Sequence, residues 1–127
     1  MSNQVIRTER GWAGHFICAN RCRFRRNTLL QYGRIEVVVS TVGLMENIDK
    51  DDKNPFDTVG CDRYFETAVF HADRRDKRYH DANISRRIPF DSPWSISEVD
   101  ADDRANDMHE NVVAELADKL IAREVKL

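Results

Sequence analysis

Residues 22–44 read CRFRRNTLLQYGRIEVVVSTVGL, and the fold is predicted mainly from this stretch. Its second half, residues 35–42, is rich in β-branched side chains, which are stiff and fit a pleated sheet. Residues 22–30 also suit a strand, and Gly33 between the two runs can adopt the positive φ that a tight connection needs. We therefore predict a β-hairpin at the middle of a sheet.

The first of these predicted strands interleaves arginines with apolar residues. Because strand side chains alternate between faces, Arg23 and Arg25 share one face. Cys22, Phe24 and Arg26 share the other. A basic face beside the strongest sheet-forming run suits an anionic ligand.

The chain of 127 residues is long enough for one domain with a hydrophobic core. We expect a single domain over residues 1–127, mainly antiparallel sheet in residues 1–90 and helical in residues 91–127. No stretch is long and apolar enough to cross a membrane, and residues 1–10 lack the apolar centre of a signal peptide, so we expect a cytoplasmic protein. Three cysteines, an odd number, argue against a disulfide framework.

The formal net charge of −2 conceals an uneven distribution. Residues 1–40 hold seven Arg and two Glu, whereas residues 91–127 hold four Lys or Arg and ten Asp or Glu. The cations are mostly arginine, whose planar guanidinium binds phosphate through two parallel hydrogen bonds. A chain without net positive charge is a poor candidate for general nucleic-acid binding. A local arginine cluster that holds a small anion stays open.

Further strands are predicted on both sides of the hairpin. Residue type and alternation favour strands at residues 4–8, 15–19 and 61–71. Residues 46–57 are polar and charged and predict a surface loop. Residues 78–88 fit either a strand or a short helix.

The clearest segment is a C-terminal helix that begins at Asp102 or Asp103 and ends near residue 124. Its apolar residues fall at helical spacing and form one stripe, which we expect to cover the sheet. The stripe consists of Ala105, Met108, Val112, Val113, Leu116, Leu120 and Ile121. The predicted fold class is therefore α+β, an antiparallel sheet of about five strands packed against a C-terminal helix.

Metal and catalytic motifs are weak. His15, Cys18 and Cys22 have zinc-ligand chemistry but no CxxC pair, and we expect buried structural thiols instead. His109 begins HENVV, in which Val113 replaces the second His of HExxH, so we expect an exposed helical His. No Gly-rich phosphate loop, GxSxG elbow or nucleophile with its base is present, so we predict no catalytic residues, cofactor or metal.

Three groups of arginines are candidates for binding an anion, and each also fits a solvated or ion-paired surface. The groups are Arg21, Arg23, Arg25 and Arg26; Arg74, Arg75 and Arg78; and Arg86 and Arg87. Aromatic side chains close in sequence, such as Phe70, can stack on a base, and Asn83 can read a base edge. Asp102 with Arg104, at a helix start, can hold a ribose hydroxyl and a phosphate, although Asp102 also fits a simple N-cap.

The phrases RGWAGHFICANRCRFRRNTLL, VVVSTVG and YFETAVF resemble those of small phage and prophage proteins. The layout is similar to that of the Thoeris anti-defence family. This resemblance implies an N-terminal antiparallel sheet, C-terminal helices, and homo-oligomers that sequester a cyclic ADP-ribose isomer without cleaving it. Some members also hold cyclic oligonucleotides. The family's pocket uses aromatic, Arg, Asn and Asp side chains, which Phe70, Asn83, Asp102 and Arg104 match by type and approximate order.

We therefore expect a phage-derived anti-defence protein that sequesters a cyclic nucleotide immune signal and is not an enzyme. The predicted ligand-binding residues are Arg23, Arg25, Arg26, Phe70, Asn83, Asp102 and Arg104. The expected partners are a small anionic nucleotide and further copies of the chain, as a dimer or hexamer, with no membrane. The alternative is a protein-binding inhibitor of a host nuclease or CRISPR complex, whose acidic residues 91–124 mimic nucleic acid. A small nucleotide hydrolase is a third hypothesis.

Overall fold

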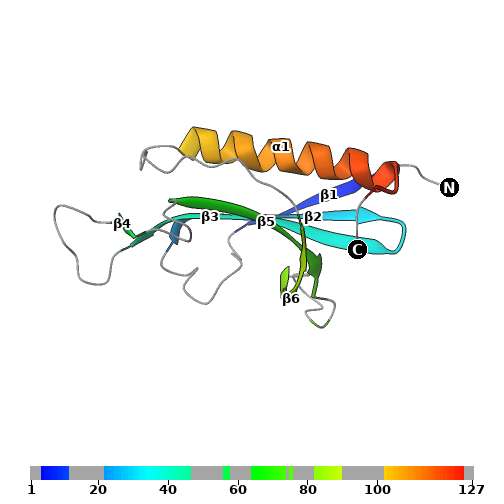
Figure 1. Ribbon diagram of the computed structural model, residues 1–127, viewed down its shortest axis with the longest axis horizontal. Coiled ribbons are helices and arrows are strands. Elements are labelled where there is room, and N and C mark those ends of the chain that lie inside the picture. Colours follow the sequence, from blue (N-terminus) through cyan, green and yellow to red (C-terminus); the bar gives the residue numbers. More distant parts are fainter. Residues whose placement is uncertain are drawn as a thin grey trace.

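The structure, a computed structural model, describes residues 4–11, 22–46, 56–57, 64–73, 75, 82–89 and 102–124. Within these residues, strands β1 to β6 form one antiparallel sheet and are followed by helix α1, so the predicted α+β fold is confirmed. The elements are β1 (Ile6–Gly11), β2 (Cys22–Tyr32), β3 (Ile35–Glu46), β4 (Phe56–Asp57), β5 (Phe65–Ala72), β6 (Ala82–Ile88) and α1 (Asp102–Ile121). Figure 1 shows α1 lying along one face of the sheet.

The β2–β3 hairpin lies at the centre of the sheet, as predicted. Tyr32 pairs with Ile35, so Gly33 and Arg34 form a two-residue turn. Gly33 has a φ of 62° and Arg34 does not have a positive φ, which is the pattern of a type II′ turn. This turn type matches the twist of the two strands, so the local sequence sets the register of the hairpin.

The strand order is β1-β2-β3-β5-β6, with β4 paired to β3. The short strand β4 and the last residue of β3, Glu46, lie within the predicted loop 46–57, so that prediction is wrong for residues 46, 56 and 57. The ambiguous segment 78–88 contains strand β6, whose pairing with β5 shifts register between Phe70 and Ala72. In Figure 1, β6 turns out of the plane of the other strands. The predicted strand 15–19 lies outside the described residues.

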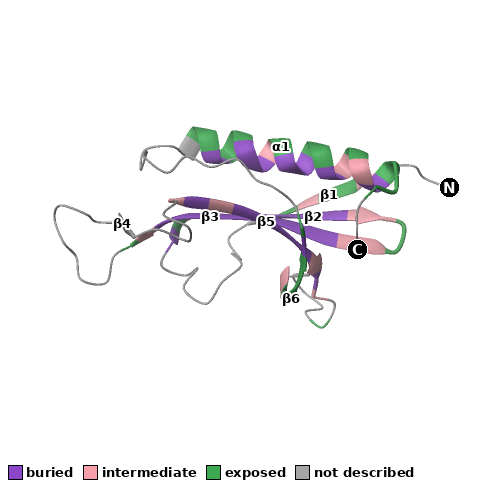
Figure 2. Ribbon diagram, viewed as in Figure 1, coloured by how far each residue is buried: buried purple, intermediate pink, exposed green. Residues whose placement is uncertain are grey.

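The main hydrophobic core lies between α1 and the sheet. Six residues of the predicted stripe are buried, whereas Ile121, the last residue of α1, is 46% exposed. Figure 2 shows this buried side of α1 turned toward the strands. The larger cluster contains Leu30, Val37, Val39, Val69, Ile88, Val112, Val113, Leu116 and Leu120. No helix within the described residues has both the length and the apolar character needed to cross a membrane.

The start of α1 lies over the other end of the sheet. Ala105 and Met108 form a second cluster with Phe65 and Leu44, and Phe24 packs against it. The rings of Phe24 and Phe65 meet edge to face with centroids 5.8 Å apart. The sheet face opposite the helix is buried as well, and there Leu29, Val38 and Ala72 form a further cluster. Strand β3 is therefore buried on both faces, which explains its nearly continuous β-branched sequence.

Candidate functional site

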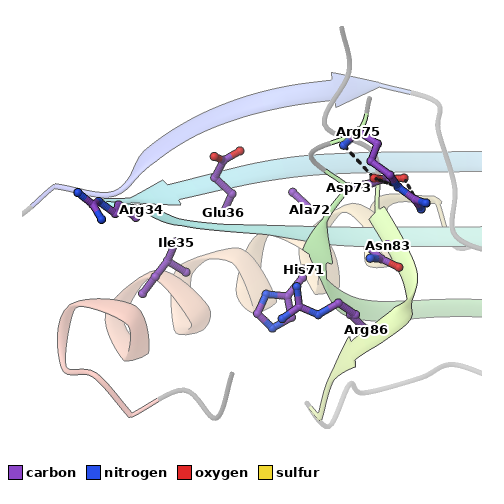
Figure 3. A pocket seen from close by; sticks show the side chains of 9 residues that line it. All are labelled: Arg34, Ile35, Glu36, His71, Ala72, Asp73, Arg75, Asn83 and Arg86. Carbon is purple, nitrogen blue, oxygen red and sulfur yellow. Dashed lines mark hydrogen bonds and ion pairs between the residues drawn. The ribbon is translucent and has the colours of Figure 1, made fainter. Parts of the chain in front are cut away.

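A cavity of about 380 Å³ lies where β3 begins and β5 ends, beside β6. Figure 3 shows the side chains that line it. They are Arg34, Ile35, Glu36, His71, Ala72, Asp73, Arg75, Asn83 and Arg86. Three arginines and a histidine from four different segments therefore meet two carboxylates around one small cavity.

The carboxylate of Asp73 is occupied by Arg75. It accepts hydrogen bonds from the Arg75 backbone N at 3.0 Å and from its Nε at 3.1 Å. These bonds lower the pKa of Asp73, which stays ionised at neutral pH. The Arg75 side chain, which is 87% exposed, is therefore paired with Asp73 at the cavity, and its charge is partly balanced.

His71 and Arg86 lie next to each other in the cavity wall (Figure 3). Burial lowers the pKa of His71, and the positive charge of Arg86 lowers it further. At pH 7 the imidazole is therefore mainly neutral, and Arg86 is the cation of this pair.

The amide of Asn83 is oriented by Ser85. Its Oδ1 accepts hydrogen bonds from the Ser85 backbone N at 3.2 Å and from Ser85 Oγ at 2.6 Å. Because the amide oxygen has these partners, the amide nitrogen is the group through which Asn83 can donate to a ligand. Asn83 is the one predicted ligand-binding residue that lines this cavity.

The other predicted site residues on the sheet lie elsewhere. Arg23 is 64% exposed and pairs with Glu46 at 3.4 Å. Arg26 lies on the helix side of the sheet, where its guanidinium binds Glu9 and Glu110. Arg25, on the opposite face, is half-buried. Phe70 is only 4% exposed, within the sheet, so its ring face is not an open stacking surface.

The predicted pair at the start of α1 is also separated from the cavity. Arg104 is exposed on the first turn of α1, and the side chain of Asp102 lies outside the described part of the chain. This end of the helix packs over Phe65, the first residue of β5, whereas the cavity lies where β5 ends. Within one copy of the chain, the predicted site residues therefore do not converge on one place.

Sequence reasoning missed a second polar constellation, beneath α1. His109 is completely buried, so the prediction of an exposed helical His is wrong. Its Nε2 lies 2.7 Å from Thr28 Oγ1, and its Nδ1 lies 2.7 Å from Thr41 Oγ1. Thr41 Oγ1 lies 2.7 Å from Thr67 Oγ1, and Thr28 Oγ1 donates to Glu9 Oε2 at 3.0 Å.

Four charged side chains extend this network to the surface. Arg7 binds both oxygens of Glu110, at 2.6 and 2.7 Å, and Arg26 binds Glu110 at 2.6 Å. The hydrogen bonds from Arg7 are the largest cause that lowers the pKa of Glu110, to about 2. Burial lowers the pKa of His109 to about 4, and the charge of Arg26 adds to this effect. The network therefore combines a neutral imidazole with two ionised carboxylates, which suits a structural role better than catalysis.

The sequence pointed to only some of the residues that line the cavity. Arg75 and Arg86 belong to arginine groups that the sequence singles out, but nothing in the sequence distinguishes Arg34 or His71 from surface residues. Cys22 is a buried free thiol, and no group of three metal-ligating side chains occurs among the described residues. Cys18, Cys61 and His15 lie outside those residues. Comparisons with protein-family models, curated proteins and solved structures give no match for this chain.

Proposed function

We propose that this protein binds and sequesters a small anionic ligand, a cyclic nucleotide immune signal, without cleaving it. The observation that supports this most is the cavity where Arg34, Arg75 and Arg86 meet His71 and Asn83. Its volume of about 380 Å³ lies at the small end of the range for ligand pockets, about 300–1,000 Å³. It therefore suits a single nucleotide-sized molecule better than a peptide or a nucleic-acid strand.

The lining suggests how each part of such a ligand is held. Guanidinium groups of Arg34 and Arg86 grip phosphate oxygens, and their planar faces also stack on a base. The Asn83 amide nitrogen donates to an oxygen on the base edge. No Phe, Tyr or Trp side chain lines the cavity among the described residues, so Arg takes the stacking role that the sequence assigned to Phe70.

Capture without reaction fits the same side chains. The described lining contains no Ser, Thr, Cys or Lys, so His71 and Glu36, which could accept a proton, have no side-chain nucleophile to activate there, and Asp73 is bound by Arg75. Binding alone must then supply the affinity, which favours a preformed cavity of fixed charges. We place this activity in the host cytoplasm, in a phage-derived homo-oligomer, a dimer or hexamer, in keeping with the resemblance to Thoeris anti-defence proteins.

The test is to incubate the protein with cyclic ADP-ribose isomers and cyclic di- and trinucleotides, remove unbound ligand, denature the protein and analyse what is released. Release of an intact ligand supports sequestration, whereas release of a cleaved product indicates a hydrolase. Thermal shift gives a second readout, since a ligand at about 100 times its Kd stabilises the fold by about 2.7 kcal/mol.

Two sets of variants identify the site. Arg34→Gln and Arg86→Gln should weaken retention by about ten-fold or more, because each removes a charge from the cavity. Arg123→Gln, an exposed helix-end residue, is the matched control. If Arg23→Gln and Arg104→Gln abolish retention while Arg86→Gln does not, the ligand site lies at the opposite end of the sheet.

The alternative, a protein-binding inhibitor that mimics nucleic acid, has one supporting observation. The exposed charged residues described on α1 are mostly acidic, with Asp103, Asp107, Glu115 and Asp118 against Arg104. Such a surface can compete for a nucleic-acid groove by charge. Recovery of a stoichiometric host nuclease in a pull-down, lost on substituting these four acids by Asn or Gln, favours this function.

A further inference from the structure

The cavity contains a titratable group that the proposed function does not use. His71 has its ring in the wall beside Arg86, as Figure 3 shows, and neither side chain makes an ion pair with a carboxylate among the described contacts. This position differs from that of His109, which is enclosed between α1 and the sheet and bonded at both ring nitrogens.

The charges around His71 come from each segment that borders the cavity. Arg34 lies in the β2–β3 turn, Glu36 on β3, Asp73 and Arg75 after β5, and Arg86 on β6; none of the lining residues belongs to α1. Three of these five groups are cationic, and Asp73 is already bound to Arg75. In the empty cavity, a proton on His71 would add a further positive charge beside Arg86.

A bound oxyanion makes the positive charge of a protonated His71 favourable instead. A phosphate or sulfate group between Arg86 and His71 attracts both cations and accepts a hydrogen bond from a protonated ring nitrogen. If the anion favours the protonated ring, the proton must favour the bound anion to the same extent, because the coupling between two ligands is reciprocal.

We propose that the cavity takes up one proton at His71 when it binds an oxyanion, so that the Arg86–His71 pair holds the anion more tightly as the pH falls. This inference rests on the proposed function, since it assigns the anion to the same cavity. It specifies the ligand class as an oxyanion of fixed charge, such as a phosphodiester, and it makes acidification a control on capture.

The probe is sulfate, which stays a dianion from pH 5.5 to 7.5, so that any change in its affinity comes from the protein. Sulfate is titrated at pH 5.5 and pH 7.5, at constant ionic strength, while backbone amide and His71 ring resonances are followed by NMR. We expect the Kd to be about five-fold lower or more at pH 5.5, and the titration midpoint of His71 to rise in saturating sulfate.

Variants distinguish a failure of proton uptake at His71 from a failure of anion capture by the cavity. His71→Gln should still bind sulfate, with a Kd that no longer changes with pH, and Arg86→Gln should bind it weakly at both pH values. Arg123→Gln should match the parent protein throughout. Binding that is independent of pH, or a pH dependence that survives in His71→Gln, overturns the proton uptake and leaves anion capture intact. Absence of cavity shifts at both pH values overturns anion capture as well.

Discussion

His109 Nε2 and Thr28 Oγ1 lie 2.7 Å apart in the interior between α1 and the sheet. Thr28 gives its one hydroxyl proton to Glu9, whose carboxylate is ionised, so Thr28 must accept from the ring. His109 is therefore the neutral Nε2–H tautomer. Its Nδ1 must then accept from Thr41, which in turn accepts from Thr67. Each of these hydrogen bonds therefore has a defined donor and a defined acceptor.

Because these hydrogen bonds run in one direction, from Thr67 to Thr41 and from Thr41 to His109, the two threonine hydroxyls are not equivalent. Thr41→Val leaves the buried Nδ1 of His109 without a donor and should cost about 2 kcal/mol in the free energy of unfolding. Thr67→Val leaves the Thr41–His109 bond in place and should cost less than about 1 kcal/mol. Urea unfolding measures both variants, which have the same change in side-chain atoms. Equal costs would show that the direction assigned here is incorrect.

Protonation of His109 opposes the folded state. Its pKa is about 4 in the fold and about 6.5 when unfolded, so the unfolded chain binds more protons in this interval. The free energy of unfolding should therefore fall as the pH is lowered from 6.5 to 4, by about 3 kcal/mol from this group at most. Urea unfolding at several pH values measures the slope.

The control for this prediction is His109→Gln, which removes the titrating ring and should flatten the slope. His71, whose pKa is also lowered, contributes in the same direction, so His71→Gln is measured in parallel. Below about pH 4.5 the ion-paired carboxylates begin to protonate. The stabilisation of the fold by ionised Glu110 is then lost progressively down to about pH 2. A His109→Gln protein with the parent slope between pH 4 and 6.5 would contradict the assignment.

Glu110 should stabilise the fold although its side chain is partly exposed, because it forms a bidentate ion pair with Arg7 and a second ion pair with Arg26. Glu110→Gln removes the charge that Arg7 and Arg26 bind, and we expect a loss of about 1 kcal/mol at low salt. The matched control is Glu115→Gln, which breaks only a 3.5 Å contact with Lys119 and should cost about 0.3 kcal/mol. In 1 M NaCl the difference between the two variants should shrink, because salt screens exposed charges. A difference that salt does not change would exclude an electrostatic origin.

Two glycines should respond differently to alanine. A Cβ at Gly43 would lie 2.7 Å from Cε1 of the buried Phe65 ring and closer still to its Cδ1, so Gly43→Ala should cost about 3 kcal/mol by overpacking. A Cβ at Gly33 meets nothing within 4 Å, and Gly33→Ala should cost about 2 kcal/mol, only from the backbone strain at its φ of 62°. Thermal or urea unfolding compares them. A Gly43→Ala protein no less stable than Gly33→Ala would mean that Phe65 moves aside at little cost.

Local chemistry made the frame of the fold predictable. A run of β-branched residues at 35–42, a glycine at the turn and an apolar stripe at helical spacing each specify a strand, a hairpin or a helix within a few residues. The alternation that places Phe24 and Arg26 on one face of β2 is of the same kind. These features follow from backbone geometry, and they led to the confirmed α+β fold.

What only the tertiary structure decided are the relationships between distant residues. His109 is buried because it meets hydroxyls 81 and 68 positions earlier in the chain, and no local pattern distinguishes it from an exposed helical His. The cavity likewise joins the hairpin turn to β6, so Arg34, His71 and Arg86 line one cavity only when the sheet has formed. Periodicity shows which face of an element is apolar, but the packing of elements determines which polar groups meet.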